Sequence, residues 1–360
     1  MPITTYAPLS TLASLLAGQQ NVRKLTADVQ QASQELSTGL RANVYADLGQ
    51  TATFTLQLRS QMDQTEAFAT SNSLLGNKLG VISTALGTVH DSAQSVLSAA
   101  LANLNSPGDT AKTLQQQARA ALDQIVTSLD TTYGGEYLFS GTASDRPPLQ
   151  GYDQTSPATG QSPQGALAAV VGSGPASAAD ATAMAAQIDA MFASGNADPA
   201  QNYQGTFYNG TPALDAAGHP NPRQTAVIAP GQTVSYGVQA NDPAIRDVIQ
   251  GLSMLASTDP SRIADPQAYK TWMNAAVGRL SDGVTGVTGA QATLGSQQQR
   301  VEQTGTGQGA LKDVLNSRIL GYEAADPYEV ASRLQVLQNQ LQATYQATAQ
   351  LGRLSILTYL

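Results

Sequence analysis

The stretch LGNKLGVISTALGTVHDSAQSVLSAA, residues 75–100, carries an apolar residue at alternating spacings of four and three. This spacing predicts a helix with one continuous apolar face, of the kind that packs in a coiled coil. Extended back to about Phe54, the pattern predicts a helix of roughly 50 residues, about 75 Å long. The apolar face consists of Leu75, Leu79, Ile82, Leu86, Val89, Ala93, Val96 and Ala100.

A tight turn follows this long helix and leads into a second one. The segment NSPGD, residues 105–109, contains Pro107 and Gly108, which are typical turn residues. Asp109 is expected to cap the second helix, and YGG at residues 133–135 is expected to end it. The apolar face of the second helix consists of Leu114, Ala118, Ala121, Ile125 and Leu129. The two helices are therefore predicted to form an antiparallel hairpin.

Both ends of the chain also carry apolar residues at helical spacing. Leu280, Val287, Leu294 and Val301 are seven residues apart, and a last helix is expected to begin at Asp326 and Pro327. The final ten residues are unusually apolar for a chain end. An amphipathic helix cannot bury its apolar face alone, so these terminal helices need partners.

We expect the terminal helices to pair with each other and with neighbouring subunits, because the apolar residues of the tail cover several faces. A monomeric coiled coil that pairs the two ends is the alternative. The subunit-interface candidates are Leu15, Val22, Val29, Leu36, Leu334, Leu337, Leu341, Leu351, Leu354, Leu357 and Leu360.

The middle of the chain has a different character, since eleven of the seventeen prolines lie between residues 136 and 243 and the heptads disappear. TAVIAPGQTVSYGV, residues 225–238, predicts two strands around Pro230 and Gly231, which favour a type II turn. YQGTFY, residues 203–208, is interpreted as a further strand, and ADATAMAAQIDAMF, residues 179–192, as a short helix. The middle is therefore expected to be a small α+β or mainly-β insert.

The predicted fold class is mainly α, with long heptad-patterned helices from both termini packed as a coiled-coil or helical bundle around this insert. The predicted domains are terminal coiled-coil helices at 1–40 and 322–360, a long-helix bundle at 41–135 and 244–321, and an outer insert at 136–243.

Composition excludes several classes of function. The 360 residues carry a net charge of −8 without a basic stripe, which argues against nucleic-acid binding. The absence of cysteine excludes disulfides, thiol catalysis and thiolate metal sites. No apolar run is long enough for membrane insertion, and the N-terminus lacks the basic residues of a secretory signal.

Candidate catalytic patterns are weak, so we expect no enzyme activity, no cofactor and no metal. GTGQGALK, residues 305–312, lacks the preceding strand and the Gly-Lys-Ser/Thr of a phosphate loop. His90 and His219 are isolated. Stacking rings for a glycan are one possible binding feature, although core or strand roles are the simpler reading: Tyr152, Tyr203, Phe207, Tyr208 and Tyr236.

Several segments resemble the flagellins and hook–filament junction proteins of bacterial flagella. QQASQELSTGLRAN, residues 30–43, is similar to the end of their N-terminal helix and the Ser/Thr-Gly-x-Arg turn after it. ADPYEVASRLQVLQNQLQ, residues 325–342, and the tail LQATYQATAQLGRLSILTYL are similar to their C-terminal helix. GGEYLFSGT, residues 134–142, resembles the junction protein, hook-associated protein type L, more than a filament flagellin. YADLGQTA, residues 45–52, departs from the phrases that filament flagellins carry there.

This resemblance implies a structural axial subunit that joins hook to filament and polymerises through its terminal helices. It implies export through the flagellar channel without a cleaved signal peptide, and an extracellular location in the flagellum. The implied partners are the subunit itself, the hook-side junction protein, flagellin and an export chaperone. A filament flagellin, or a flagellin-like cell-surface protein that binds a polysaccharide or a receptor, is the alternative.

Overall fold

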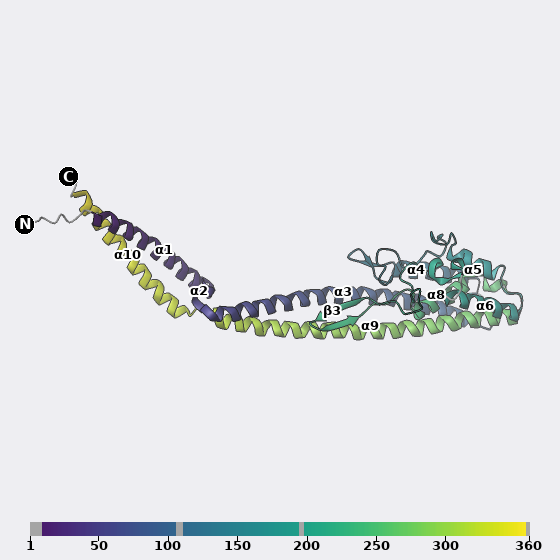
Figure 1. Cartoon of the computed structure of the whole chain (residues 1–360). Coiled ribbons are helices and arrows are strands. Elements are labelled where there is room, and N and C mark those ends of the chain that lie inside the picture. The colour runs from purple at the N-terminus through teal and green to yellow at the C-terminus, as the bar shows by residue number, and fades with distance from the viewer. Residues whose placement is uncertain (1–8, 106–110, 194–197, 358–360) are drawn as a thin grey trace, which may run out of the picture. The chain divides into compact units, whose positions relative to one another are not determined.

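A computed structural model describes residues 9–105, 111–193 and 198–357, with the side chains of 16–350 within them (Figure 1). The expected cap at Asp109 lies outside these residues. Long helices from both ends pack together, and the strands form two small two-stranded sheets, which confirms the predicted mainly helical class. The chain divides into two compact units: unit 1, Met1–Ala67 with Gln308–Leu360, and unit 2, Phe68–Gly307.

Unit 1 is built almost entirely from helices of the two chain ends. Helix α1 (Leu9–Thr38) packs along α10 (Pro327–Leu357), as Figure 1 shows. The short α2 (Val44–Leu48) and the 3₁₀ turn η1 (Gly49–Thr51) lead into the first residues of α3 (Ala52–Ala102). The last residues of α9 (Pro266–Glu323) complete the unit.

Unit 2 contains the remainder of α3 and α9 together with α4 (Ala111–Leu129) and α8 (Pro243–Ser257). The apolar face predicted for residues 75–100 is buried in one continuous core, which confirms the helix and its facing. The predicted face of α4 is buried in the same core.

Two glycines allow α8 and α9 to approach each other closely within unit 2. A Cβ atom on Gly251 of α8 would lie 2.8 Å from the backbone nitrogen of Leu280. A Cβ atom on Gly283 of α9 would lie 2.5 Å from the backbone nitrogen of Val248. Any larger residue at either position would therefore force the two helices apart.

The middle of the chain folds onto the core of unit 2. It contains α5 (Pro163–Val171), α6 (Ala178–Phe192), α7 (Tyr203–Thr206) and the 3₁₀ turn η2 (Pro199–Gln201), and a further 3₁₀ turn, η3 (Pro260–Arg262), follows α8. The sheets pair β1 (Thr132–Tyr133) with β2 (Glu136–Tyr137), and β3 (Thr225–Ala229) with β4 (Gln232–Ser235). The predicted helix at 179–192 is confirmed as α6. The hairpin around Pro230 and Gly231 is confirmed as β3 and β4, with Gly231 at φ 71°.

The strand predicted at residues 203–208 is wrong. The chain turns there, because Gly205 adopts a φ of 102°, which a strand cannot accommodate. The aromatic residues are buried instead: the Tyr203 and Phe207 rings stack with centroids 5.5 Å apart, and the Tyr203 hydroxyl donates to the Ala240 carbonyl at 2.8 Å. The aromatic residues here form part of a packed turn and not of a pleated strand.

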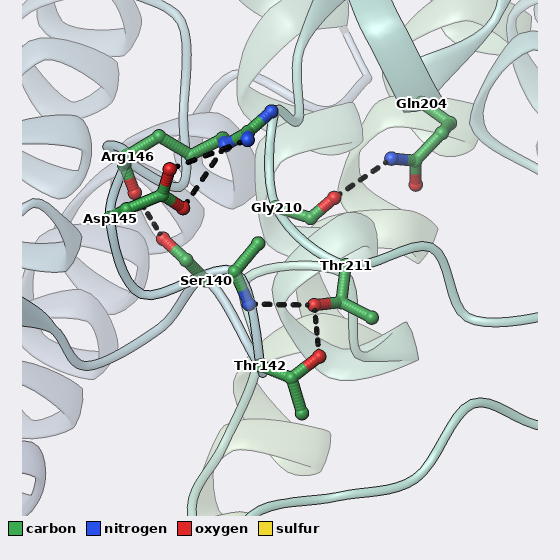
Figure 2. A network of polar contacts seen from close by, with 8 residues as sticks. Ser140, Thr142, Asp145, Arg146, Gln204, Gly210 and Thr211 are labelled. Atoms are coloured by element: carbon green, nitrogen blue, oxygen red, sulfur yellow. Dashed lines mark hydrogen bonds and ion pairs between the residues drawn. The ribbon is translucent and has the colours of Figure 1, made fainter.

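The loop after β2 is fixed by a polar network with a second loop of unit 2 (Figure 2). The Thr142 and Thr211 hydroxyls lie 2.9 Å apart, and the Ala143 N–H donates to the Thr211 hydroxyl at 3.0 Å. Within the first loop, the Ser140 hydroxyl donates to the Arg146 carbonyl at 2.7 Å. Thr142 of GGEYLFSGT thus connects two loops that are far apart in the sequence, and Ser140 stabilises the first of them.

Candidate subunit interface

The α1–α10 pair buries only a narrow strip of each helix. Val22 and Val29 of α1 and Leu334, Leu337 and Leu341 of α10 are half-buried, whereas the Leu36 side chain is 41% exposed. The predicted candidates Leu15, Leu351, Leu354, Leu357 and Leu360 lie outside the residues whose side chains the structure describes. One helix partner therefore leaves the candidate residues partly open to solvent.

A buried carboxylate fixes the turn at the end of α1. Glu35 is 2% exposed and pairs with Arg333 of α10. It also accepts hydrogen bonds from the Gln31 side chain at 3.3 Å and from the Ala42 N–H at 3.1 Å. Because several donors surround this carboxylate, its burial is compensated.

The turn that follows, STGLRAN, pairs with the end of α9 through its backbone. The Arg41 N–H donates to the Glu323 carbonyl at 2.8 Å, and the Ala325 N–H donates to the Gly39 carbonyl at 2.9 Å. Gly39 has a φ of 69°, a conformation that favours glycine. This conformation explains the glycine of the Gly-x-Arg turn that follows the first helix.

A second buried carboxylate joins α9 to the start of α3. Glu323 is buried and accepts from the Arg59 Nε at 3.0 Å, and this hydrogen bond raises the pKa of Arg59. Nearby, the Lys312 ammonium lies 2.9 Å from the Glu66 carboxylate. The sequence analysis missed Glu35, Arg59, Glu323 and Arg333, because a helical stripe indicates which residues share a face and not which partners lie across from them.

Unit 1 exposes many large apolar side chains. Among the side chains that the structure describes, the exposed ones in unit 1 are Leu16, Leu36, Tyr45, Phe54, Leu56, Leu311, Val314, Leu320, Tyr322, Tyr328, Val336 and Tyr345. Among the same described side chains, the buried apolar residues of unit 1 are only five, and two of them are alanines: Ala32, Ala52, Leu315, Ile319 and Val330. An apolar surface this extensive is typical of a protein–protein contact.

Among the residues that the structure describes, the two histidines each lie next to a single aspartate and form no larger polar site. The Nδ1 atom of His90 lies 3.1 Å from the carboxylate of the exposed Asp91, and the Nδ1 atom of His219 lies 3.5 Å from the carboxylate of Asp215. Across ranges 9–105, 111–193 and 198–357, no group of three or more acidic, histidine or cysteine residues is placed to hold a metal ion. In the same ranges, no helix combines the length and apolar character that a membrane span requires.

Comparison with known proteins places this arrangement in a family. The bacterial flagellin N-terminal helical region matches residues 9–144, and the bacterial flagellin C-terminal helical region matches residues 277–360. A search of curated proteins found no match. A solved structure of a presumed flagellar hook-associated protein from Vibrio parahaemolyticus shares the fold, with a TM-score of 0.50 and 14% identity over 76% of this chain and 98% of that one. The two matched regions include α1, α10 and the turn after α1 that Glu35 fixes. The chain belongs to the bacterial flagellin family of structural, axial flagellar proteins.

Proposed function

We propose that this chain is a structural junction subunit, which joins the hook to the filament and polymerises through its terminal helices. The observation that carries the proposal is the exposed apolar surface of unit 1, whereas unit 2 buries its own core. The interface candidates predicted from the sequence, from Leu15 to Leu360, are part of this proposal. Subunits packed on several sides would cover the surface that the α1–α10 pair leaves exposed.

Two features of the sequence favour the role of a hook–filament junction protein over that of a filament flagellin. GGEYLFSGT resembles the junction protein, and YADLGQTA departs from filament flagellins at the position after the Arg turn. The structural neighbour from Vibrio parahaemolyticus carries the description of a hook-associated protein, which agrees with this choice. The proposed partners are other copies of this subunit, the hook-side junction protein and flagellin, with an export chaperone before assembly. We further propose export through the flagellar channel without a cleaved signal peptide.

A glycan-binding role has less support from the geometry. Of the five aromatic residues considered as stacking surfaces, Tyr152, Tyr203, Phe207 and Tyr208 are buried in unit 2. Tyr236 is half-buried and carries the Lys78 ammonium 5.5 Å from its ring centroid. Rings that are covered by protein atoms cannot stack on a sugar.

Immunogold labelling of intact flagella against unit 2 tests the proposed role. A junction subunit gives label in one short zone between hook and filament. Label along the whole filament would identify a filament flagellin, and label over the cell body would favour a surface protein. A strain that lacks this chain should complete its hooks and fail to retain a filament, and expression of the full chain should restore it.

A further inference from the structure

Unit 1 contains a groove between the first turns of α3 and the last turns of α9. It has a volume of about 570 Å³ and is lined by Phe54, Gln57, Leu58, Gln61, Arg318, Gly321 and Tyr322. Phe54 and Tyr322 are 59% and 41% exposed, so their rings are available to a partner. Arg318 is the one charged residue of this lining, is itself exposed, and forms no ion pair among the residues that the structure describes.

A complementary protrusion lies at the start of α10. Tyr328 is 88% exposed, which is the largest value among the exposed large apolar side chains of the described residues. Its backbone is held in place, because its N–H donates to the Asp326 carboxylate at 2.8 Å and Pro327 fixes the preceding φ angle. Asp326 and the exposed Glu329 flank the ring with negative charge.

The two features match in chemistry. A groove that offers two aromatic rings, a leucine and a single arginine suits an aromatic ring that is accompanied by a carboxylate. Tyrosine is frequent among the residues that dominate binding energy. Tyr328 does not occupy the groove of its own chain, since its side chain is almost fully exposed. The partner that carries this same aromatic-acidic segment is a second copy of the chain.

We propose that Tyr328 of one subunit docks into the groove of the next subunit, with its Glu329 facing Arg318 of that neighbour. The inference rests on the proposed function, since it describes one contact within the polymer. The Tyr328 protrusion and the groove are different surfaces, so the contact is heterologous. Each subunit inserts its Tyr328 ring into one neighbour and accepts the Tyr328 ring of another neighbour in its own groove. Heterologous contacts propagate into rings or helical arrays, whereas a symmetric contact stops at a dimer.

Charge reversal tests the ionic part of this contact. Arg318→Glu and Glu329→Arg should each reduce incorporation into flagella by about tenfold or more, and the double variant should recover most of it. Arg300→Glu, at an exposed arginine of α9 outside the groove, is the matched control and should incorporate normally. If the double variant is as defective as the worse single variant, Arg318 and Glu329 do not face each other.

Cysteine cross-linking tests the geometry, since the natural chain has no cysteine to interfere. One variant is Ser332→Cys, at a position one turn after Tyr328 on the same face of α10. The other is Gln57→Cys, at a position that lines the groove. Both leave Tyr328, Glu329 and Arg318 intact. Flagella from cells that produce both single-cysteine chains should yield an oxidised dimer, and flagella with either variant alone should not.

Three results would overturn the inference. One is the absence of the mixed dimer in flagella that contain both variants. Another is a dimer formed by Ser332→Cys alone, which would indicate a symmetric contact between two α10 helices. In both cases the chain is still incorporated, so the junction proposal stands while this contact is rejected. Failure of the wild-type chain to enter flagella at all would reject both proposals.

Discussion

Unit 2 buries the apolar faces of its long helices, whereas unit 1 leaves most of its large apolar side chains in solvent. Every residue of the continuous apolar core belongs to unit 2. Unit 1 has half as many residues, yet it holds twelve of the sixteen exposed large apolar side chains among those described. The helices of the two units carry similar stripes, so a stripe alone does not indicate whether a helix is buried within its own chain or between chains.

The buried residues of unit 1 differ in kind as well as in number. Among the side chains that the structure describes, half of the buried ones in unit 1 are polar, and they include the carboxylates Glu35 and Glu323, each paired with an arginine. We expect these ion pairs to specify which surfaces meet, while apolar burial supplies most of the stabilising free energy. We therefore expect unit 2 to determine the stability of the monomer and unit 1 to determine assembly.

The largest effect is expected from removing Leu351–Leu360, which deletes six large apolar side chains. If neighbouring subunits bury them, the assembled state loses on the order of 10 kcal/mol per subunit, as an upper bound. The Tm of the monomer should hardly change, because its core lies in unit 2. Thermal melts and an incorporation assay on wild type and truncation measure the two quantities separately.

A milder form of the same experiment is Leu354→Asp, which places one charge in the proposed packed surface. It should reduce incorporation without changing the melt. A truncated chain that melts many degrees lower and still assembles would show that the tail belongs to the core of its own subunit.

A matched pair of leucine substitutions compares the two units directly. Leu280 is fully buried in unit 2, so Leu280→Ala should lower the free energy of unfolding of the monomer by about 2–5 kcal/mol. Leu337 of α10 is half-buried, so Leu337→Ala should cost the monomer less than about 1 kcal/mol and reduce incorporation strongly. Denaturant unfolding measures the first quantity. Equal losses of monomer stability would remove the distinction between the units.

The Glu35–Arg333 pair gives a smaller, more local effect. Arg333→Met leaves the Glu35 carboxylate buried without its cation, which should destabilise the α1–α10 pair by about 2 kcal/mol, since the arginine is partly exposed and screened. Limited proteolysis within residues 20–45 should report the opening of this pair while the melt of unit 2 stays constant. The double variant Glu35→Gln with Arg333→Met should recover most of the protection. No recovery would mean that Arg333 acts through packing.

Local patterns in the sequence predicted the long helices and the β3–β4 hairpin, because periodicity and turn residues act over short distances. The prediction failed where packing overrides local preference. Around Tyr203, the aromatic residues form part of a buried turn and not a strand. The predicted three-part domain division stays a prediction, and Ile188 and Phe192 of the predicted insert contribute to the core of unit 2.

For the candidate interface, the heptads indicated which faces of α1 and α10 are apolar. They could not indicate the ion pairs Glu35–Arg333, between α1 and α10, and Arg59–Glu323, between α3 and α9, because the partners are 298 and 264 positions apart. Such pairs depend on the fold of the whole chain and leave no local periodicity.

The smallest expected effect concerns Asp130 of unit 2. A substitution there should change the free energy of unfolding without changing assembly, which separates the roles of the two units. Asp130 follows the C-terminal end of α4, is half-buried, and has one carboxylate oxygen without a hydrogen-bond partner in the described part of the chain. Burial raises the pKa of Asp130 to about 6, and a hydrogen bond from the Leu149 N–H lowers it in part. The folded state therefore binds more protons than the unfolded state between about pH 4 and 6, so this group lowers stability as pH rises through that window.

Asp130→Asn removes the charge at a similar volume. It should raise the free energy of unfolding at pH 7.5 by about 1 kcal/mol, after allowance for solvent screening of a half-buried group, and change it little at pH 4. The measurement is the difference between variant and wild-type unfolding free energies at each pH, because burial also raises the pKa values of Asp123 and Asp247. Asp313→Asn, which makes the same substitution at an exposed carboxylate of α9 in unit 1, is the control. Since Asp130 lies in the unit that folds on its own core, incorporation into flagella should be unchanged. A variant whose stability gain is the same at both pH values would mean that the Asp130 carboxylate titrates no differently in the folded and unfolded chains.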